Sequence, residues 1–329
     1  MASMPSVDLG VSSDGRAPLA ELVAQAVTAE AAGATTLWIA NHLFLRDPIG
    51  AASAALAATR RIRVALMAMS PYAMHPVAIA MTAATLDELH PGRVILCLGV
   101  GAPGDLAAAG IQTPRPIATM REAIQVCRQL LAGDTAAHDG EIYKVAGRRL
   151  PNPSRRVPIV VAASGPQMLA LAGAHADGVL ISAATAPAFI GWCLEQVERG
   201  ERARAVPGRC RRMAIVYTRI ADEPAAAIAS IRRTIGFILR GPHHAKNVEL
   251  AGTRLDQQAL WDAYRAEDWT TVERLITDDV VRAHAAAGSA QQVAQRYRQY
   301  RALGLDELII GGIDDRAGIA QALDAVTPG

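Results

Sequence analysis

The stretch Arg61–Gly104 constrains the fold more than any other part of the chain. It contains two short apolar runs, Ile62–Met69 and Val94–Leu98, each bounded by turn residues and too uniformly apolar for half-exposed strands. Strands of this composition are typically buried on both faces of a parallel sheet. The segment between them, Pro76–Leu89, has the length of a crossover helix, so the stretch predicts a βαβ unit.

The same alternation of strand and helix runs along the whole chain. The predicted strands are Val7–Val11, Thr35–Ala40, Ile62–Met69, Val94–Leu98, Pro158–Ala162, Asp177–Ser182, Met213–Ile220 and Glu307–Ile310. The predicted helices are Pro18–Ala32, Ile49–Ala58, Pro76–Leu89, Ile117–Leu131, Gln167–Ala174, Pro187–Glu198, Ala225–Leu239, Ser289–Leu303 (capped by Ser289) and Arg316–Ala325.

Eight alternations favour an α/β fold of the (β/α)8 TIM-barrel type over an open doubly wound sheet. A barrel of this kind usually has about 250 residues. This chain has 329 residues, and most of the additional residues fall in two predicted insertions. One follows the fourth helix at 133–153, and the other follows the seventh strand at 240–287. The first insertion contains Ile142–Val145 as one arm of a hairpin, and the second shows no clear strand. We expect a single domain spanning residues 1–329.

Composition excludes several functional classes. The net charge of +2 gives no electrostatic basis for binding nucleic acid or membranes, and no apolar run reaches the roughly 18 residues of a membrane span. The N-terminus MASMPSVDLG lacks the pattern of a signal peptide. The four cysteines are scattered without CxxC spacing, and Cys97 lies inside an apolar strand. We therefore expect a cytoplasmic protein with reduced thiols and no metal site.

The segment Gly99–Gly104 matches the pattern GxGxxG directly after a strand, which alone would suggest a dinucleotide site. It follows the fourth strand rather than the first, and Pro103 removes an amide that a phosphate cradle would use. No acidic residue ends a neighbouring strand, since Glu122 falls inside a helix. A loop that lets backbone approach a flat ring is the better interpretation, and a Rossmann dehydrogenase remains an alternative.

Two further loops follow strands and carry candidate chemistry. In Ser164-Gly165-Pro166, the proline suits a first helical position, so the amides of Gly165, Gln167 and Met168 would point into the loop face. That arrangement fits either a phosphate site or an ordinary helix cap. Asn41-His42 follows the second strand, where a histidine can act as general acid or base.

Several segments together resemble the bacterial luciferase-like superfamily: TLWIANH, SPYAMHP, TLDELHPGRVILCLGVG, PIVVAASGPQMLALAGAHADGVLIS and AAAGSAQQVAQRYRQYRALGLDELII. The pattern SPY…HP followed by TLDEL-x-PGR is most similar to the reductases that use the deazaflavin coenzyme F-420, with methylenetetrahydromethanopterin reductase as the nearest type. The resemblance implies an eight-stranded barrel, with the coenzyme's ring at its C-terminal mouth and a homodimer as the usual assembly.

The resemblance also implies roles for individual residues. His42 corresponds to a catalytic histidine beside the ring, and Asn41 replaces an aspartate that many members carry. A cis peptide bond is implied at Met67–Ala68, where members usually have glycine before the bond. The implied coenzyme-binding residues are Asn41, Met67, Ala68, Met69, Ser70, Gly99, Val100, Gly101, Ala163, Ser164, Gly165, Gln167 and Met168. Among them, Ser164, Gly165 and Gln167 would hold the coenzyme's phosphate.

The leading hypothesis is an oxidoreductase that moves a hydride between reduced coenzyme F-420 and a small carbonyl, imine or activated alkene. An FMN-dependent luciferase-like monooxygenase is the first alternative. The two hypotheses differ in chemistry, because FMN activates oxygen and a deazaflavin does not. A non-catalytic flavin-binding protein is the second.

Overall fold

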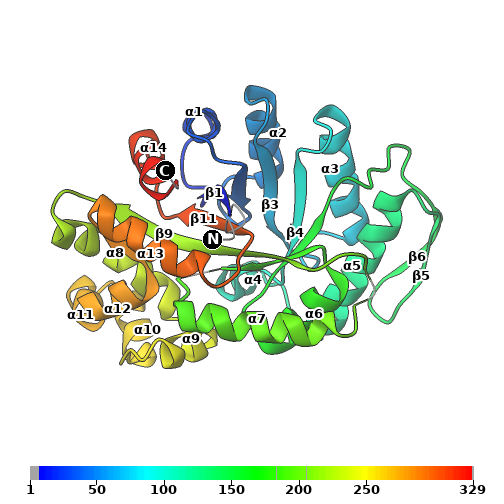
Figure 1. Cartoon of the computed structure of the whole chain (residues 1–329). Coiled ribbons are helices and arrows are strands. Elements are labelled where there is room, and N and C mark those ends of the chain that lie inside the picture. The colour runs from blue at the N-terminus through cyan, green and yellow to red at the C-terminus, as the bar shows by residue number, and fades with distance from the viewer. Residues whose placement is uncertain (1–6, 183, 205, 328–329) are drawn as a thin grey trace.

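The computed structural model describes residues 7–182, 184–204 and 206–327, and its centre is a closed barrel of parallel strands (Figure 1). Each strand pairs in parallel with its neighbours, β1 with β11 completes one side, and β8 with β9 closes the ring. The eight barrel strands are β1 (Asp8–Ser13), β2 (Thr36–Ala40), β3 (Arg63–Met69), β4 (Val94–Leu98), β7 (Ile159–Ala162), β8 (Gly178–Ile181), β9 (Arg211–Ile220) and β11 (Glu307–Gly311). The predicted TIM barrel is confirmed.

Helices surround the barrel and follow the strands as predicted. They are α1 (Leu19–Ala31), α2 (Pro48–Ala58), α3 (Pro76–Leu89), α5 (Pro116–Ala132), α6 (Pro166–His175), α7 (Pro187–Glu201), α8 (Pro224–Leu239), α13 (Ala290–Arg301) and α14 (Arg316–Val326). Six of these, from α2 to α8, begin with proline at the first helical position, where no amide is needed and the backbone angle is already helical. Ser289 caps α13 in a capping box with Gln292, as the sequence predicts for Ser289.

The first insertion is a hairpin of β5 (Ala136–Asp139) and β6 (Lys144–Arg148), so the predicted hairpin is confirmed although its second arm begins two residues late. The buried carboxylate of Glu122 on α5 holds its turn, because it accepts hydrogen bonds from the amides of Glu141, Ile142 and Tyr143 at 2.9–3.0 Å. Glu122 therefore has a structural task, consistent with its predicted place inside a helix.

The second insertion packs as a group of short helices beside α8 and α13 (Figure 1). It contains a 3-10 turn (Pro242–His244), α9 (Ala245–Leu250), α10 (Gln257–Arg265), α11 (Trp269–Leu275) and α12 (Asp278–His284). Their apolar side chains form a separate core with α8, which includes Ile231, Leu260 and Val280.

Two elements were not predicted. The segment 240–287 ends in a short strand, β10 (Ala286–Gly288), so the prediction of no strand there is wrong. β10 pairs with Thr218–Ile220, the end of β9 that extends beyond its pairing with β8, and its sequence AAG carries none of the bulky residues that mark strands. A six-residue helix, α4 (Pro103–Ala108), also lies inside the glycine-rich segment.

Alternating residues of the strands form two separate cores. Outward-facing side chains such as Val64, Leu66 and Leu96 pack against the helices. Inward-facing side chains fill the barrel and form a second cluster, namely Trp38, Ala65, Ile95, Cys97, Val160, Leu180, Met213, Ile215 and Ile309. Burial raises the pKa of Cys97, as expected for a thiol that serves as a core residue.

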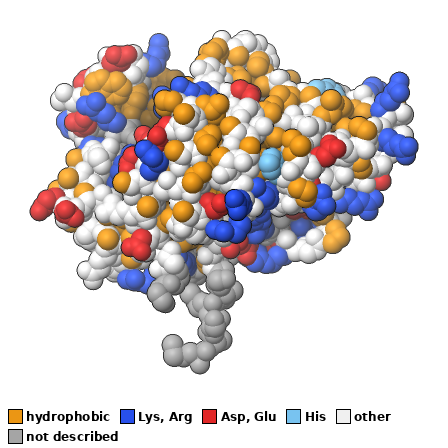
Figure 2. Space-filling view, turned by 90° about the horizontal axis from the view of Figure 1, so that it is seen from above, with side chains coloured by type: hydrophobic (Ala, Val, Ile, Leu, Met, Phe, Trp, Pro, Cys, Tyr) orange, Lys and Arg blue, Asp and Glu red, His pale blue; other side chains and the backbone are white. Residues whose placement is uncertain are grey.

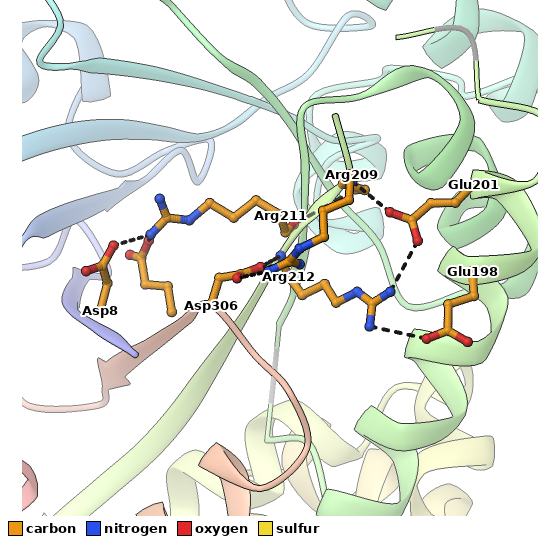
Figure 3. A network of polar contacts seen from close by, with 9 residues as sticks. Asp8, Glu198, Glu201, Arg209, Arg211, Arg212 and Asp306 are labelled. Carbon is orange, nitrogen blue, oxygen red and sulfur yellow. Dashed lines mark hydrogen bonds and ion pairs between the residues drawn. The ribbon is translucent and has the colours of Figure 1, made fainter. Parts of the chain in front are cut away.

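A network of charges occupies the N-terminal end of the barrel (Figure 3). The fully buried carboxylate of Glu307 accepts hydrogen bonds from Trp38 Nε1 at 2.8 Å and from Thr36 Oγ1, and it pairs with Arg211 at 3.2 Å. Arg211 also pairs with Asp8. These groups join β11, β2, β9 and β1, so the network links strands around the barrel.

The remaining contacts in Figure 3 join the same end of the barrel to α7. Arg209 pairs with Asp306, and Arg212 reaches Glu198 and Glu201 on α7, each at 3.2 Å. Acidic and basic side chains are interspersed over the face seen in Figure 2, in keeping with the small net charge. Within the described ranges, no helix has the length and apolar character needed to span a membrane.

Replacing Glu307 with alanine should lower the free energy of unfolding by about 2–3 kcal/mol, because it leaves the Trp38 N–H and the Thr36 hydroxyl buried without their acceptor, while Arg211 keeps Asp8. Urea unfolding followed by circular dichroism measures the loss. Lys144→Ala, which removes an exposed ion pair with Asp139, should change stability by no more than about 0.5 kcal/mol. Equal losses in the two variants would contradict the role assigned to Glu307.

Candidate active site

The C-terminal ends of the strands form the opening of the barrel, and partly exposed side chains lie there above the inner core. Met67 and Ala68 from β3, Ala162 from β7 and Tyr217 from β9 pack against the inner cluster from this side. Burial raises the pKa of Tyr217 to about 12, so its hydroxyl stays protonated at neutral pH. These four side chains make an uncharged base for the opening, suited to a flat apolar group.

Asn41 and His42 follow β2 directly, as predicted, and both are partly buried. The side-chain amide of Asn41 donates a hydrogen bond to the carbonyl of Ala68 at 3.3 Å. A carbonyl oxygen only accepts, so the position requires a donor. The side-chain amide of Asn41 therefore fixes the end of β2 to the end of β3.

His42 contacts Asp105, which sequence reasoning missed. The His42 Nδ1 atom lies 3.4 Å from a carboxylate oxygen of Asp105, and the two side chains are 43% and 34% exposed. Asp105 belongs to α4, the short helix that the glycine-rich pattern concealed. The pair leaves Nε2 of the ring as the nitrogen available to a reactant.

The end of β3 bends, and the Met67–Ala68 peptide bond is cis, which confirms the position implied by the resemblance. The pairing of β3 with β4 shifts register between Leu66 and Met69. Ser70 follows the bend and donates its hydroxyl hydrogen to the carbonyl of Val100 at 2.6 Å. The bend and the glycine-rich loop are thus hydrogen-bonded to each other.

Gly99 and Gly101 are required by the local backbone. A Cβ atom on Gly99 would lie 2.8 Å from Ala68 Cβ, closer than two carbon atoms can approach. Gly101 has φ of +105°, which a side chain would strain. Val100 and Gly101 line one end of a groove of about 330 Å³ that continues to Thr113. The helix after this loop has only six residues and begins at Pro103, so the loop differs from a dinucleotide fingerprint.

The loop after β7 forms the next part of the opening. Gly165 is the N-cap of α6 and Pro166 its first residue, as predicted, and no side chain caps the helix. The amides of Gln167 and Met168 consequently face out of the first turn with the positive end of the helix dipole. Ala163 is buried, Ser164 is partly buried and Gln167 is exposed.

The predicted site residues lie on one continuous arc, because β2, β3, β4 and β7 are successive neighbours in the barrel. The arc brings together Asn41, His42, the bend from Met67 to Ser70, the loop from Gly99 to Gly101 and the turn from Ala163 to Met168. A Cβ atom on Gly99 would lie 3.5 Å from Ala162 Cβ, so the last two loops are in close contact.

The second insertion is fixed to the loop after β8 by buried polar side chains. Asn247 donates to the carbonyl of Ala184 at 2.9 Å and accepts from the amide of Ala186 at 3.1 Å. His284 lies 2.9 Å from the same carbonyl through Nδ1, which must carry the proton, and burial lowers its pKa to about 4. Burial likewise lowers the pKa of His244 to about 3. Both rings are neutral at pH 7, and nothing in the sequence pattern marked them or Asn247.

An α/β barrel with this opening is the architecture of an enzyme whose site lies at the C-terminal ends of the strands. The profile of the family described as luciferase-like monooxygenase matches residues 3–307, and the chain belongs to that family. A 5,10-methylenetetrahydromethanopterin reductase of Archaeoglobus fulgidus is 29% identical over 290 residues, covering 86% of each chain. The resemblance to the F-420 branch is confirmed.

Two further comparisons agree with this assignment. An F-420-dependent glucose-6-phosphate dehydrogenase of Gordonia bronchialis is 33% identical over 175 residues, which cover 49% of this chain and 52% of that protein. The solved structure of the coenzyme F-420 dependent tetrahydromethanopterin reductase from Methanopyrus kandleri superposes with a TM-score of 0.88 over 98% of each chain. At 23% identity, that superposition shows the common fold.

Gly99→Ala should weaken coenzyme binding at least tenfold, because the new methyl group would displace Ala68 and the bend that carries it. Fluorescence titration of the purified variant with coenzyme F-420 measures the effect. Gly104→Ala is the matched control, since a Cβ atom there meets nothing within 4 Å. If Gly99→Ala keeps the wild-type affinity for coenzyme F-420 and an intact far-ultraviolet circular dichroism spectrum, coenzyme binding does not depend on the close approach of Gly99 to Ala68.

Proposed function

We propose that this protein is an oxidoreductase that uses coenzyme F-420 to transfer a hydride to or from a small organic substrate. The main support is the likeness to F-420-dependent methylenetetrahydromethanopterin reductases over 86% of each chain. The substrate would carry a carbonyl, an imine or an activated alkene. The FMN-dependent monooxygenase is the weaker alternative, because it rests on more distant relatives.

The residues present fit a deazaflavin. The absent side chain at Gly99 lets Ala68 approach, so that the bend at Met67–Ala68 packs against the glycine-rich loop and offers small groups to a flat ring. Tyr217 and Ala162 supply uncharged contacts beside it. When bound, the coenzyme supplies hydride-transfer chemistry.

The coenzyme's phosphate has a suitable position at the start of α6. The amides of Gln167 and Met168 are free there, no side-chain cap occupies them, and the hydroxyl of Ser164 lies next to the turn. Anions are stabilised at such helix N-termini by the dipole as well as by the hydrogen bonds. We therefore assign Ala163, Ser164, Gly165, Gln167 and Met168 to the phosphate end of the coenzyme, and the loop Gly99–Gly101 to the ring side.

His42 is the group that gives or takes the proton accompanying hydride transfer. Its Nδ1 atom is held by Asp105, so Nε2 faces away from that carboxylate and is available to the substrate. Asn41 does not exchange protons, because its amide is committed to the carbonyl of Ala68. It positions the end of β2 and with it His42.

The function is tested by titrating the purified protein separately with coenzyme F-420 and with FMN while following the fluorescence of each. Saturable binding of coenzyme F-420 with at least tenfold preference over FMN is expected, since proteins similar to this chain are named as F-420-dependent enzymes. Tight binding of FMN without binding of coenzyme F-420 would overturn the proposal in favour of the monooxygenase.

Replacing His42 with alanine should lower kcat by about 10²–10⁴ and leave the affinity for coenzyme F-420 nearly unchanged. The reason is that the imidazole of His42 transfers a proton in the reaction and does not hold the coenzyme. Steady-state rates and coenzyme titrations separate the two effects. His90→Ala, at the opposite end of α3 from the barrel mouth, should retain the wild-type rate. A His42→Ala enzyme of full activity would remove the residue from the reaction.

We further propose that residues 1–329 act as one functional unit, as a homodimer in the cytoplasm. The four cysteines are free and buried, which suits a reducing compartment. The dimer is supported only by the usual assembly of the superfamily.

A further inference from the structure

The second insertion carries an arginine surrounded by aromatic rings. The guanidinium carbon of Arg240, at the end of α8, lies 3.8 Å from the ring centroid of Phe237. It also lies 5.1 Å from the centroid of Tyr264 and 5.6 Å from that of Trp261, both on α10. Three rings around one guanidinium form a stacked cation–π arrangement, here called the Arg240 cluster.

The Arg240 cluster is open to solvent on one side. Phe237 and Trp261 are 45% and 38% exposed, although a separate apolar core lies beneath them in the same insertion. Large aromatic side chains that stay exposed beside a core of this kind are typical of contact surfaces for ligands or partners. Packing of the insertion alone does not explain them.

The charge of Arg240 is also left without an acidic partner. On the same helix, Arg232 pairs with Asp278 at 2.6 Å and Arg233 pairs with Glu273 at 2.7 Å. No carboxylate of the residues described in this structure lies within 4 Å of the Arg240 guanidinium. The Nη1 atom of Arg240 donates a hydrogen bond to the carbonyl of Phe237, and stacking occupies the faces of the guanidinium plane. The remaining N–H donors at its edge are available to an anion.

The insertion that carries the Arg240 cluster is attached at the barrel opening. Asn247 and His284 hydrogen-bond to the loop after β8, and β10 pairs with the C-terminal end of β9. Burial lowers the pKa of Arg240, and the charges of Tyr264 and Asp105 oppose that change. Asp105 itself contacts His42. An anionic group held by Arg240 would consequently lie on the side of the opening formed by the insertion.

We propose that Arg240, stacked on Phe237, Tyr264 and Trp261, determines specificity by binding a carboxylate or phosphate group of the substrate. This inference rests on the proposed function, because it assigns the anion to the substrate rather than to the coenzyme. Two parallel N–H donors match the two oxygens of a carboxylate or phosphate, and the exposed Trp261 ring offers a stacking surface for a flat substrate.

The first test needs no coenzyme. Benzoate and phenyl phosphate are titrated into the wild-type protein while tryptophan fluorescence is followed, with benzyl alcohol as the uncharged match. We expect saturable binding of the two anions, at least tenfold weaker binding by Arg240→Gln, and an intermediate affinity for Arg240→Lys, which keeps the charge but loses the planar fork. Benzyl alcohol should bind all three proteins equally.

Arg233→Gln is the matched control. Arg233 also lies over a ring, 5.2 Å from the centroid of Trp269, but it already pairs with Glu273. Its replacement should leave anion binding unchanged. Absence of saturable anion binding in the wild type, equal binding by Arg240→Gln, or equal losses in the two variants would each overturn the proposal.

A second measurement separates substrate from coenzyme. Arg240→Gln should bind coenzyme F-420 with wild-type affinity, and in turnover it should raise KM for anionic substrates at least tenfold. A parallel loss of coenzyme affinity would assign Arg240 to the coenzyme and overturn the inference. If the wild type binds no coenzyme F-420 while anion binding still depends on Arg240, the proposed function fails and the anion site stands.

Discussion

Closure of the barrel is the constraint on which the rest of the structure depends. Every barrel strand pairs with two neighbours, so all their C-terminal ends meet at one opening and all their N-terminal ends at the other. The two ends are chemically opposite. At the N-terminal end, the buried carboxylate of Glu307 is fully occupied by Trp38, Thr36 and Arg211. At the opening, polar side chains such as His42 keep a hydrogen-bonding atom that no group of the described residues occupies, as a reacting site requires.

The neutral amide of Asn41 follows from the bend opposite it. The carbonyl of Ala68 is the partner within reach, and it can only accept a hydrogen bond. An ionised carboxylate at this position would place two acceptors against each other, which is unfavourable in a partly buried site. We therefore expect proton transfer to depend on His42, whose partner Asp105 comes from a different loop. The uncharged side chain of Asn41 leaves the acid–base chemistry that we propose to a single ring.

The sequence allowed most of the fold to be predicted, because the signals involved are local. Uniformly apolar runs mark strands buried on both faces, and proline at the first helical position marks where seven of the described α-helices begin. The site was predictable where it lies directly after such strands. Asp105, Tyr217 and Arg240 were missed because their roles depend on contacts across the barrel mouth. The position of the cis bond at Met67 came from resemblance, since no local pattern specifies it.

The arrangement divides the active site into two parts with different origins. The arc on β2, β3, β4 and β7 is made of backbone, glycines and small side chains, and it lies on the strands that define the family's fold. The opposite wall is an insertion with its own apolar core, attached through Asn247 and His284 to the loop after β8 and through β10 to the end of β9. A core of that kind can change its surface without disturbing the barrel, because its apolar side chains pack mainly against one another. Coenzyme binding is therefore expected to depend on the arc, and choice of substrate on the insertion that carries Arg240.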